Sequence, residues 1–141
     1  METLAWVATI DAFQFLIYEH PAHTREDRLK AWLAIRRRFA PATVDWSGLE
    51  DIEKYLWHRQ LHIFEAPFYY IEYGIAQIGA LQLWLRYRED PKKALSDYKV
   101  GLALGGSQRL PEIFRTAGIK FDFSEKTMAP LLAAVREEIG L

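Results

Sequence analysis

The chain contains no cysteine, and this absence removes two classes of site. Disulfide frameworks and thiolate metal centres both depend on cysteine, so neither is available to these 141 residues. A chain without cysteine suits a reducing compartment, and we expect a cytoplasmic protein. The N-terminus also has no basic region leading into an apolar run, which argues against a secretory signal peptide.

An excess of charge of either sign is also missing, since the formal net charge is -1. Nucleic acids and anionic membranes attract strongly basic proteins, so we expect neither as a partner. The longest stretch with little charge, residues 68–85, approaches the length of a membrane span. It contains Glu72, Gln77 and Gln82, which favours a buried helix of a soluble domain over a transmembrane one.

Several motifs that carry chemistry are absent too. The sequence has no GxxxxGK[ST], GxGxxG or GxSxG, so phosphate-loop and serine-hydrolase functions have no support. His58 and His62 have the four-residue spacing of a zinc helix, but the segment reads HRQLH, without the glutamate of HExxH or an obvious third ligand. We therefore predict that this chain's own residues bind no metal. His20 and His23, beside Pro21, are predicted to be solvent-exposed.

Apolar and aromatic residues are abundant. Hydrophobic residues make up 50% of the chain and aromatic residues 14%, including 5 Trp. A single domain of this length hides only part of its surface, so we expect some of this material to pack against a surface outside the chain. We find no internal repeat or composition shift that marks a domain boundary, and we predict a single helical region spanning residues 1–141.

Helical spacing of apolar residues dominates the sequence, and strand alternation is nearly absent. The predicted fold class is therefore all-α. Prolines, glycines and polar capping residues mark the ends of the expected helices. These helices cover about residues 2–19, 24–39, 45–59, 67–88, 91–105, 111–117 and 124–139.

Particular residues predict the helix ends. Thr24 with Asp27 resembles a capping box, and Asp45 or Ser47 is expected to cap the third helix. Pro67 suits the first position of a long fourth helix, which we expect to be buried on most sides because it has no wide polar face.

The second half of the chain has similar signals. Pro91 opens the fifth helix, and Gly118 is expected to end the sixth. Ser124 is the predicted cap of the last helix. Pro130 is expected to lie in an early turn of that helix or to kink it.

Aromatic residues gather just after Pro67. Within the expected helix, Tyr69 and Tyr73 share a face, whereas Tyr70 points about 100° away from Tyr69. Buried phenols need hydrogen-bond partners, so the cluster suits ligand binding or catalysis as well as a purely structural role. The pair Gly105-Gly106, with Ser107, forms a flexible junction between two helices, and most such pairs are simply a helix end and a turn.

The segment WHRQLHIFEAPFYYIEYGIAQIGALQLW, followed by an acidic-Pro break, LALGGS and RTAGIKFDF, resembles the C-terminal catalytic region of oligoendopeptidase F. The preceding DAFQFLIYEHP and VDWSGLEDIEKY fit the same family, whose relatives include thimet oligopeptidase and bacterial dipeptidyl carboxypeptidase. The similarity extends over essentially the whole chain. It implies the helical C-terminal portion of a larger zincin-like metallopeptidase catalytic domain, acting on short peptides.

The resemblance also implies roles for single residues. In the family, a histidine and tyrosines across the cleft from a zinc ion donate hydrogen bonds to the oxyanion and the substrate backbone. His62 matches that histidine and Tyr69 the oxyanion-binding tyrosine, with Tyr70 as the alternative because the spacing is one residue longer than in many relatives. A second family tyrosine has no counterpart at its expected place, where Ile75 and Ala76 stand; Tyr73 either substitutes for it or lines the cleft. Substrate binding is assigned to Tyr70, Tyr73, Gly105, Gly106 and Ser107.

The main departure from the family is that HExxH and the later glutamate ligand do not occur in this sequence. In a full-length relative both precede the matching region. We therefore expect zinc in the full-length enzyme only, with the N-terminal part of the catalytic domain as a partner and no activity from this chain alone. Two alternatives stay open: a split enzyme whose second chain carries HExxH, and a stand-alone helical module that binds peptides or a partner helix.

Overall fold

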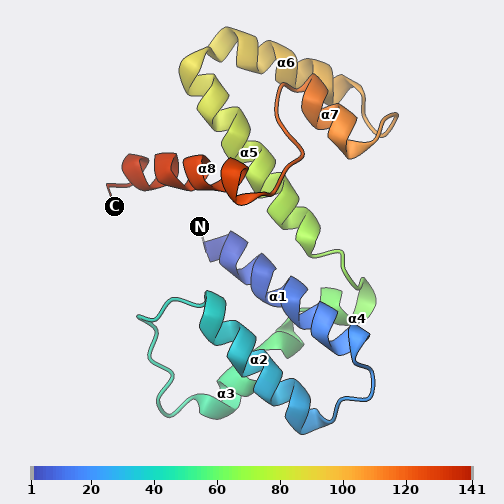
Figure 1. Ribbon diagram of the computed structural model, residues 1–141, viewed down its shortest axis with the longest axis vertical. Coiled ribbons are helices and arrows are strands. Elements are labelled where there is room, and N and C mark those ends of the chain that lie inside the picture. Colours follow the sequence, from blue (N-terminus) through green and yellow to red (C-terminus); the bar gives the residue numbers. More distant parts are fainter. Residues whose placement is uncertain (1, 141) are drawn as a thin grey trace. The chain divides into compact units, whose positions relative to one another are not determined.

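The computed structural model describes residues 2–140, which form helices joined by turns, with no β-strand in that range (Figure 1). The all-α prediction is therefore confirmed. The described residues divide into two compact units, one ending at Gly74 and the other beginning at Ile75. The proposal that residues 1–141 form one segment of a single catalytic domain stays a prediction. Within residues 2–140, no helix combines the length and the apolar character needed to span a membrane.

The first unit is built on a pair of packed helices. Helix α1 contacts α2, and the turn between them ends at Thr24, whose side chain and that of Asp27 form the predicted capping box. Shorter elements follow, and the unit closes with the first residues of α5. Its helices are α1 (Glu2–Glu19), α2 (Arg25–Phe39), α3 (Glu50–Lys54), the 3-10 helix η1 (Leu56–Arg59) and α4 (His62–Glu65).

Large side chains fill the core of this first unit. The ring of Phe13 lies 5.3 Å from that of Trp32 and 5.2 Å from that of Trp57, so α1, α2 and η1 meet at one aromatic cluster. Ile10 and Ile63 complete the cluster. The buried indole N–H of Trp32 donates to the carbonyl oxygen of Glu53 at 2.9 Å, which satisfies its only polar group.

The second unit contains most of α5 (Ile71–Glu89) and the three helices that follow, α6 (Pro91–Ala103), α7 (Leu110–Thr116) and α8 (Glu125–Glu138). As predicted, Pro91 opens α6, and the carboxylate of Asp90 accepts a hydrogen bond from the backbone N–H of Lys93 at 3.0 Å. Gly118, with φ +76, follows the end of α7, also as predicted.

The side chain of Arg86 links α5, α6 and the end of α7 by hydrogen bonds. From α5 its guanidinium donates to the carbonyl oxygen of Ala117, after α7, at 2.7 Å, and to Asp97 of α6 at 2.5 Å. Gly118 leaves room for it, because a Cβ there would lie 2.1 Å from Nη1 of Arg86. At Gly101 a Cβ would lie 2.8 Å from the Cβ of Ala117, so α6 and α7 approach closely as well.

The third predicted helix is shorter and differently capped. Asp45 and Ser47 do not cap it; instead, Asp45 accepts hydrogen bonds from the backbone N–H and hydroxyl of Ser47, at 2.9 and 2.7 Å. Such a local turn uses the groups that a cap would need. Helix α3 begins only after Leu49, and at Tyr55 it gives way to η1.

The start of the long fourth helix was also predicted wrongly. Helix α5 begins at Ile71, and Pro67 lies in the loop before it. In that loop Phe68 has φ +62, and its backbone N–H donates to Oε1 of Gln14 at 2.8 Å. This tertiary hydrogen bond holds a backbone conformation that cannot belong to a helix. The helix is also more exposed than expected, since its buried residues are confined to Gly74, Ile78 and Gly79.

The last helix starts where it was predicted, but its cap differs. Ser124 occupies the N-cap position of α8, yet its hydroxyl donates to Asp122 instead of accepting from the helix. Asp122 also accepts from the hydroxyl of Thr127. Pro130 falls in the second turn of α8, and the helix continues through it.

Candidate functional site

His58 and His62 do not form a pair. A four-residue spacing places two imidazoles on one face only within a continuous helix, but η1 ends at Arg59 and α4 begins at His62. The His58 ring lies edge-on to Trp57 with ring centroids 4.1 Å apart, whereas His62 lies among tyrosines. Within residues 2–140, no three His, Asp or Glu side chains are grouped so that they could hold a metal. That this chain's own residues bind no metal stays a prediction.

Three tyrosines surround the imidazole of His62. Its centroid lies 5.8 Å from that of Tyr69, in a nearly parallel stack, and 5.1 Å from that of Tyr70, edge-on. Nε2 of His62 lies 3.2 Å from the hydroxyl of Tyr73. The structure thus brings together all four of the predicted site residues that precede the second unit.

The predicted 100° separation of Tyr70 from Tyr69 is wrong. It assumed that both lie on one helix, but α5 begins after them, at Ile71. In the loop both rings lie near the His62 imidazole, that of Tyr69 nearly parallel to it and that of Tyr70 edge-on.

The tyrosines differ in their environment. Tyr69 and Tyr73 are exposed, at 52% and 44%, whereas Tyr70 is half-buried and packs against the aromatic core. Burial raises the pKa of Tyr70 above its usual value, and the nearby Trp6 side chain partly offsets this rise. Tyr70 therefore stays protonated and inward, while the Tyr69 side chain is available to a ligand.

Gln60 and Trp6, which the sequence analysis did not single out, form hydrogen bonds on the Nδ1 side of His62. Nε2 of Gln60 lies 2.7 Å from Nδ1 of His62. The indole N–H of Trp6 donates to Oε1 of the same Gln60 amide at 3.1 Å. The spacing of residues along the sequence cannot relate Trp6 to Gln60, which lies 54 positions later. The only local signal was that Gln60 is a polar residue two positions before His62.

Gln14 was also missed. It is fully buried on α1, and its Oε1 accepts the Phe68 N–H that fixes the loop before the tyrosines. The hydroxyl of Tyr18 donates to the carbonyl oxygen of Ile63 at 2.8 Å, beside His62 in α4. Helix α1 thereby positions both chain segments that carry the cluster.

The other predicted substrate-binding residues, Gly105, Gly106 and Ser107, lie in the second unit, just after α6. Gly105 has φ +53, and all three residues are exposed. The Ser107 hydroxyl donates to the carbonyl oxygen of Leu104 at 2.7 Å, which closes a local turn. Their substrate-binding role stays a prediction.

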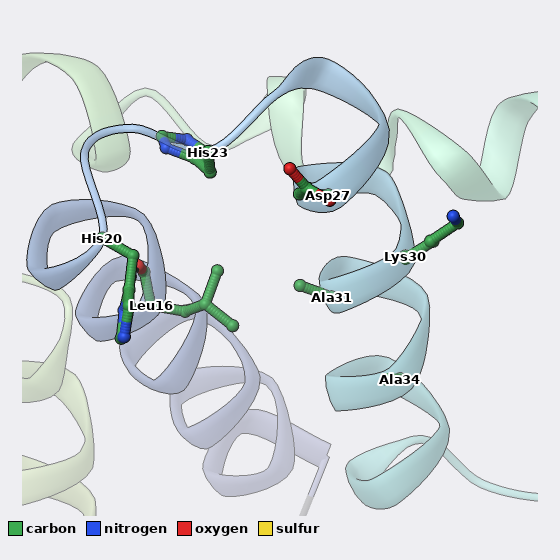
Figure 2. Close-up of a pocket in the computed structure, with 7 residues that line it drawn as sticks. All are labelled: Leu16, His20, His23, Asp27, Lys30, Ala31 and Ala34. Carbon is green, nitrogen blue, oxygen red and sulfur yellow. Dashed lines mark hydrogen bonds between the residues drawn. The ribbon is translucent and has the colours of Figure 1, made fainter.

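A hollow of about 600 Å³ lies between α1 and α2. Figure 2 shows Leu16 of α1 and Ala31 of α2 facing each other across it, with His20 and His23 near its rim. His20 is exposed, as predicted, but His23 is half-buried, with Nε2 3.2 Å from Nη1 of Arg28. None of the predicted site residues lines this hollow.

Comparison with known proteins places the chain in a family. Residues 2–131 match the family model described as Peptidase family M3. Searches of curated proteins and of solved structures returned no match. Because the family model covers nearly the whole sequence, the chain belongs to Peptidase family M3.

Proposed function

We propose that this chain is part of a zinc-dependent oligoendopeptidase that hydrolyses short peptides. In this proposal His62 and Tyr69 donate hydrogen bonds to the oxyanion that forms when the scissile carbonyl is attacked. The observation that carries it is the His62 imidazole surrounded by three phenols, in a chain that belongs to a peptidase family. Donors held in place before the reaction stabilise such a charge because they need no reorganisation.

The roles follow from exposure and contacts. Tyr69 is the exposed phenol stacked on His62, which suits the oxyanion donor, and Tyr70 packs inward. Tyr73, exposed and 3.2 Å from Nε2 of His62, suits contact with the substrate backbone. The substrate-binding role predicted for Gly105, Gly106 and Ser107 is a separate part of the proposal, because these residues lie in the second unit.

Zinc and its ligands belong, in this proposal, to the N-terminal part of the catalytic domain. This sequence contains no HExxH, so we expect the chain alone to be inactive. A zinc titration followed by calorimetry should give only weak surface binding. A stoichiometric site with submicromolar affinity would contradict this assignment, because two separated imidazoles would then have formed a site of their own.

The test is kinetic and uses the enzyme that contains the N-terminal part. Tyr69→Phe and His62→Ala should each lower kcat by roughly 10²–10³ with little change in KM, because the lost donors act on the transition state. Tyr87→Phe, at an equally exposed tyrosine of the second unit, is the matched control and should leave kcat unchanged. Zinc content should not change in any variant. A Tyr69→Phe enzyme with normal kcat would rule out the proposed donor.

A second candidate is a stand-alone module that binds short peptides or a partner helix. One observation favours it: His62 and its three tyrosines assemble within the first compact unit, two of those tyrosines being exposed. Calorimetry with the chain alone separates the two functions. Peptide binding that weakens in Tyr69→Phe would support the module, and the absence of binding would leave the peptidase as the function.

A further inference from the structure

The side-chain amide of Gln60 lies between two nitrogen atoms of different kinds. On one side is the indole Nε1 of Trp6, 3.1 Å from Oε1, and on the other is Nδ1 of His62, 2.7 Å from Nε2. An indole N–H is only a donor, so the amide must present its oxygen to Trp6. The amide nitrogen then necessarily faces His62. Chemistry alone thus selects one of the two orientations of the Gln60 amide.

That orientation decides which nitrogen of His62 carries a proton. The amide N–H of Gln60 donates to Nδ1, so Nδ1 must offer a lone pair. In a neutral imidazole the proton then lies on Nε2, the atom 3.2 Å from the Tyr73 hydroxyl. His62 is therefore a donor on the side where the tyrosines gather.

We propose that Trp6 and Gln60 are positioning residues that fix His62 as its Nε2–H tautomer and direct this donor towards the hydroxyl of Tyr73. For its catalytic consequence, the proposal rests on the function assigned to His62 above. The hydrogen bonds run from Trp6 to Gln60, from Gln60 to His62, and from His62 towards Tyr73.

The packing around Trp6 supports this chain of hydrogen bonds. Its ring lies edge-on to the fully buried Trp32, with centroids 5.9 Å apart, and the guanidinium of Arg59 lies 5.7 Å from its centroid. Helix α1 therefore holds the Trp6 N–H in place from the core side. Because the core fixes the Trp6 N–H, this donor in turn fixes the side-chain amide of Gln60 beside His62.

Tautomers are read directly by nuclear magnetic resonance on the whole chain with nitrogen-labelled histidine, at a pH where the rings are neutral. We expect His62 to show an unprotonated Nδ1 and a protonated Nε2. His20 is an internal reference of opposite kind, because its Nδ1 lies 3.3 Å from the carbonyl oxygen of Leu16 and must carry the proton there. The His62 signals are identified by their loss in His62→Ala.

Two variants test the cause. Gln60→Leu keeps the approximate shape but removes both hydrogen bonds, so the His62 signals should shift towards a mixture of tautomers while those of His20 stay fixed. Trp6→Phe removes the indole N–H and part of the ring, keeps an aromatic side chain against Trp32, and leaves the amide free to rotate, so it should shift the same signals by less. If Gln60→Leu does not fold, the His62 signals of Trp6→Phe alone test whether the hydrogen bonds fix the tautomer. A wild-type His62 with its proton on Nδ1, or His62 signals unchanged in folded variants, would overturn the proposal.

Kinetics then separate this inference from the proposed function. In the enzyme with its N-terminal part, Gln60→Leu should lower kcat by roughly 10-fold without raising KM, less than the loss of the donor itself. If His62→Ala leaves kcat unchanged while the tautomer is as expected, the proposed function is wrong. Trp6 and Gln60 then still fix the His62 tautomer, but this has no effect on catalysis. If His62→Ala lowers kcat but the tautomer is the opposite one, only the present inference fails.

Discussion

The two compact units are held together in different ways. In the first, large aromatic side chains fill the core, with Phe13 and Trp32 fully buried. In the second, the buried residues are aliphatic residues and glycines, namely Ile78, Gly79, Ala94, Gly101, Ala117, Ile119 and Leu131. There, helices approach through small residues, and an arginine links them through charged and backbone hydrogen bonds.

This difference predicts different sensitivities. A core of interlocking rings loses most when volume is removed, since the neighbours cannot fill the gap. A contact built on close backbone approach loses most when volume is added. The aromatic core also explains why the candidate site belongs to the first unit, because the rings fix Trp6 and, through it, Gln60 and His62.

The largest effect is expected from Trp32→Ala. The side chain is fully buried and its N–H donates to the carbonyl oxygen of Glu53, so truncation leaves a cavity and removes this hydrogen bond. The free energy of unfolding should fall by about 3–5 kcal/mol, measured by denaturant unfolding followed by circular dichroism. Trp84→Ala, at a half-buried tryptophan of the second unit, is the control and should cost less. Equal losses would mean that the two units do not differ as described.

A smaller effect is expected from adding volume in the second unit. Gly118→Ala places a Cβ 2.1 Å from Arg86 Nη1, at a φ of +76 that disfavours any side chain. It should cost roughly 2–4 kcal/mol, by combining backbone strain with displacement of the arginine. Gly105→Ala is the matched control, because it has φ +53 but no atom within 4 Å, and it should cost only the strain, about 1 kcal/mol. Similar losses of unfolding free energy in both variants would mean that displacement of Arg86 contributes nothing to the cost of Gly118→Ala.

The sequence was most informative where a helix end depends on neighbouring residues. The Thr24 capping box, Pro91 at the start of α6 and Gly118 after α7 were all predicted correctly. The pattern was misleading at Pro67, where the helix was expected to begin. There the buried amide of Gln14 holds Phe68 at positive φ, and a tertiary contact of this kind leaves no mark in local spacing.

The candidate site was predicted in part, for the same reason. The family resemblance assigned His62, Tyr69 and Tyr73 to one site, and the three rings do lie together, while their roles stay predictions. The face that each ring presents was not predictable, because Tyr69 and Tyr70 lie in a loop before α5. The contribution of Trp6 depends on the packing of α1 against α2, which brings distant residues together.

The smallest expected effect concerns charge in the second unit. Hydrogen bonds from Arg86 and then Lys93 lower the pKa of Asp97 below its usual value. A carboxyl whose pKa is lower in the folded state contributes stability above its unfolded pKa, and that contribution is lost as the pH falls through the folded value. Asp97→Asn should therefore lower the melting temperature modestly at pH 7, and this difference from wild type should vanish in acid. Asp51→Asn, at a carboxylate 91% exposed and paired only with Lys54, is the control and should change the melting temperature little at any pH. An Asp97→Asn deficit that persists unchanged at low pH would mean that the carboxyl acts through packing, and that the second unit gains nothing from its charged hydrogen bonds.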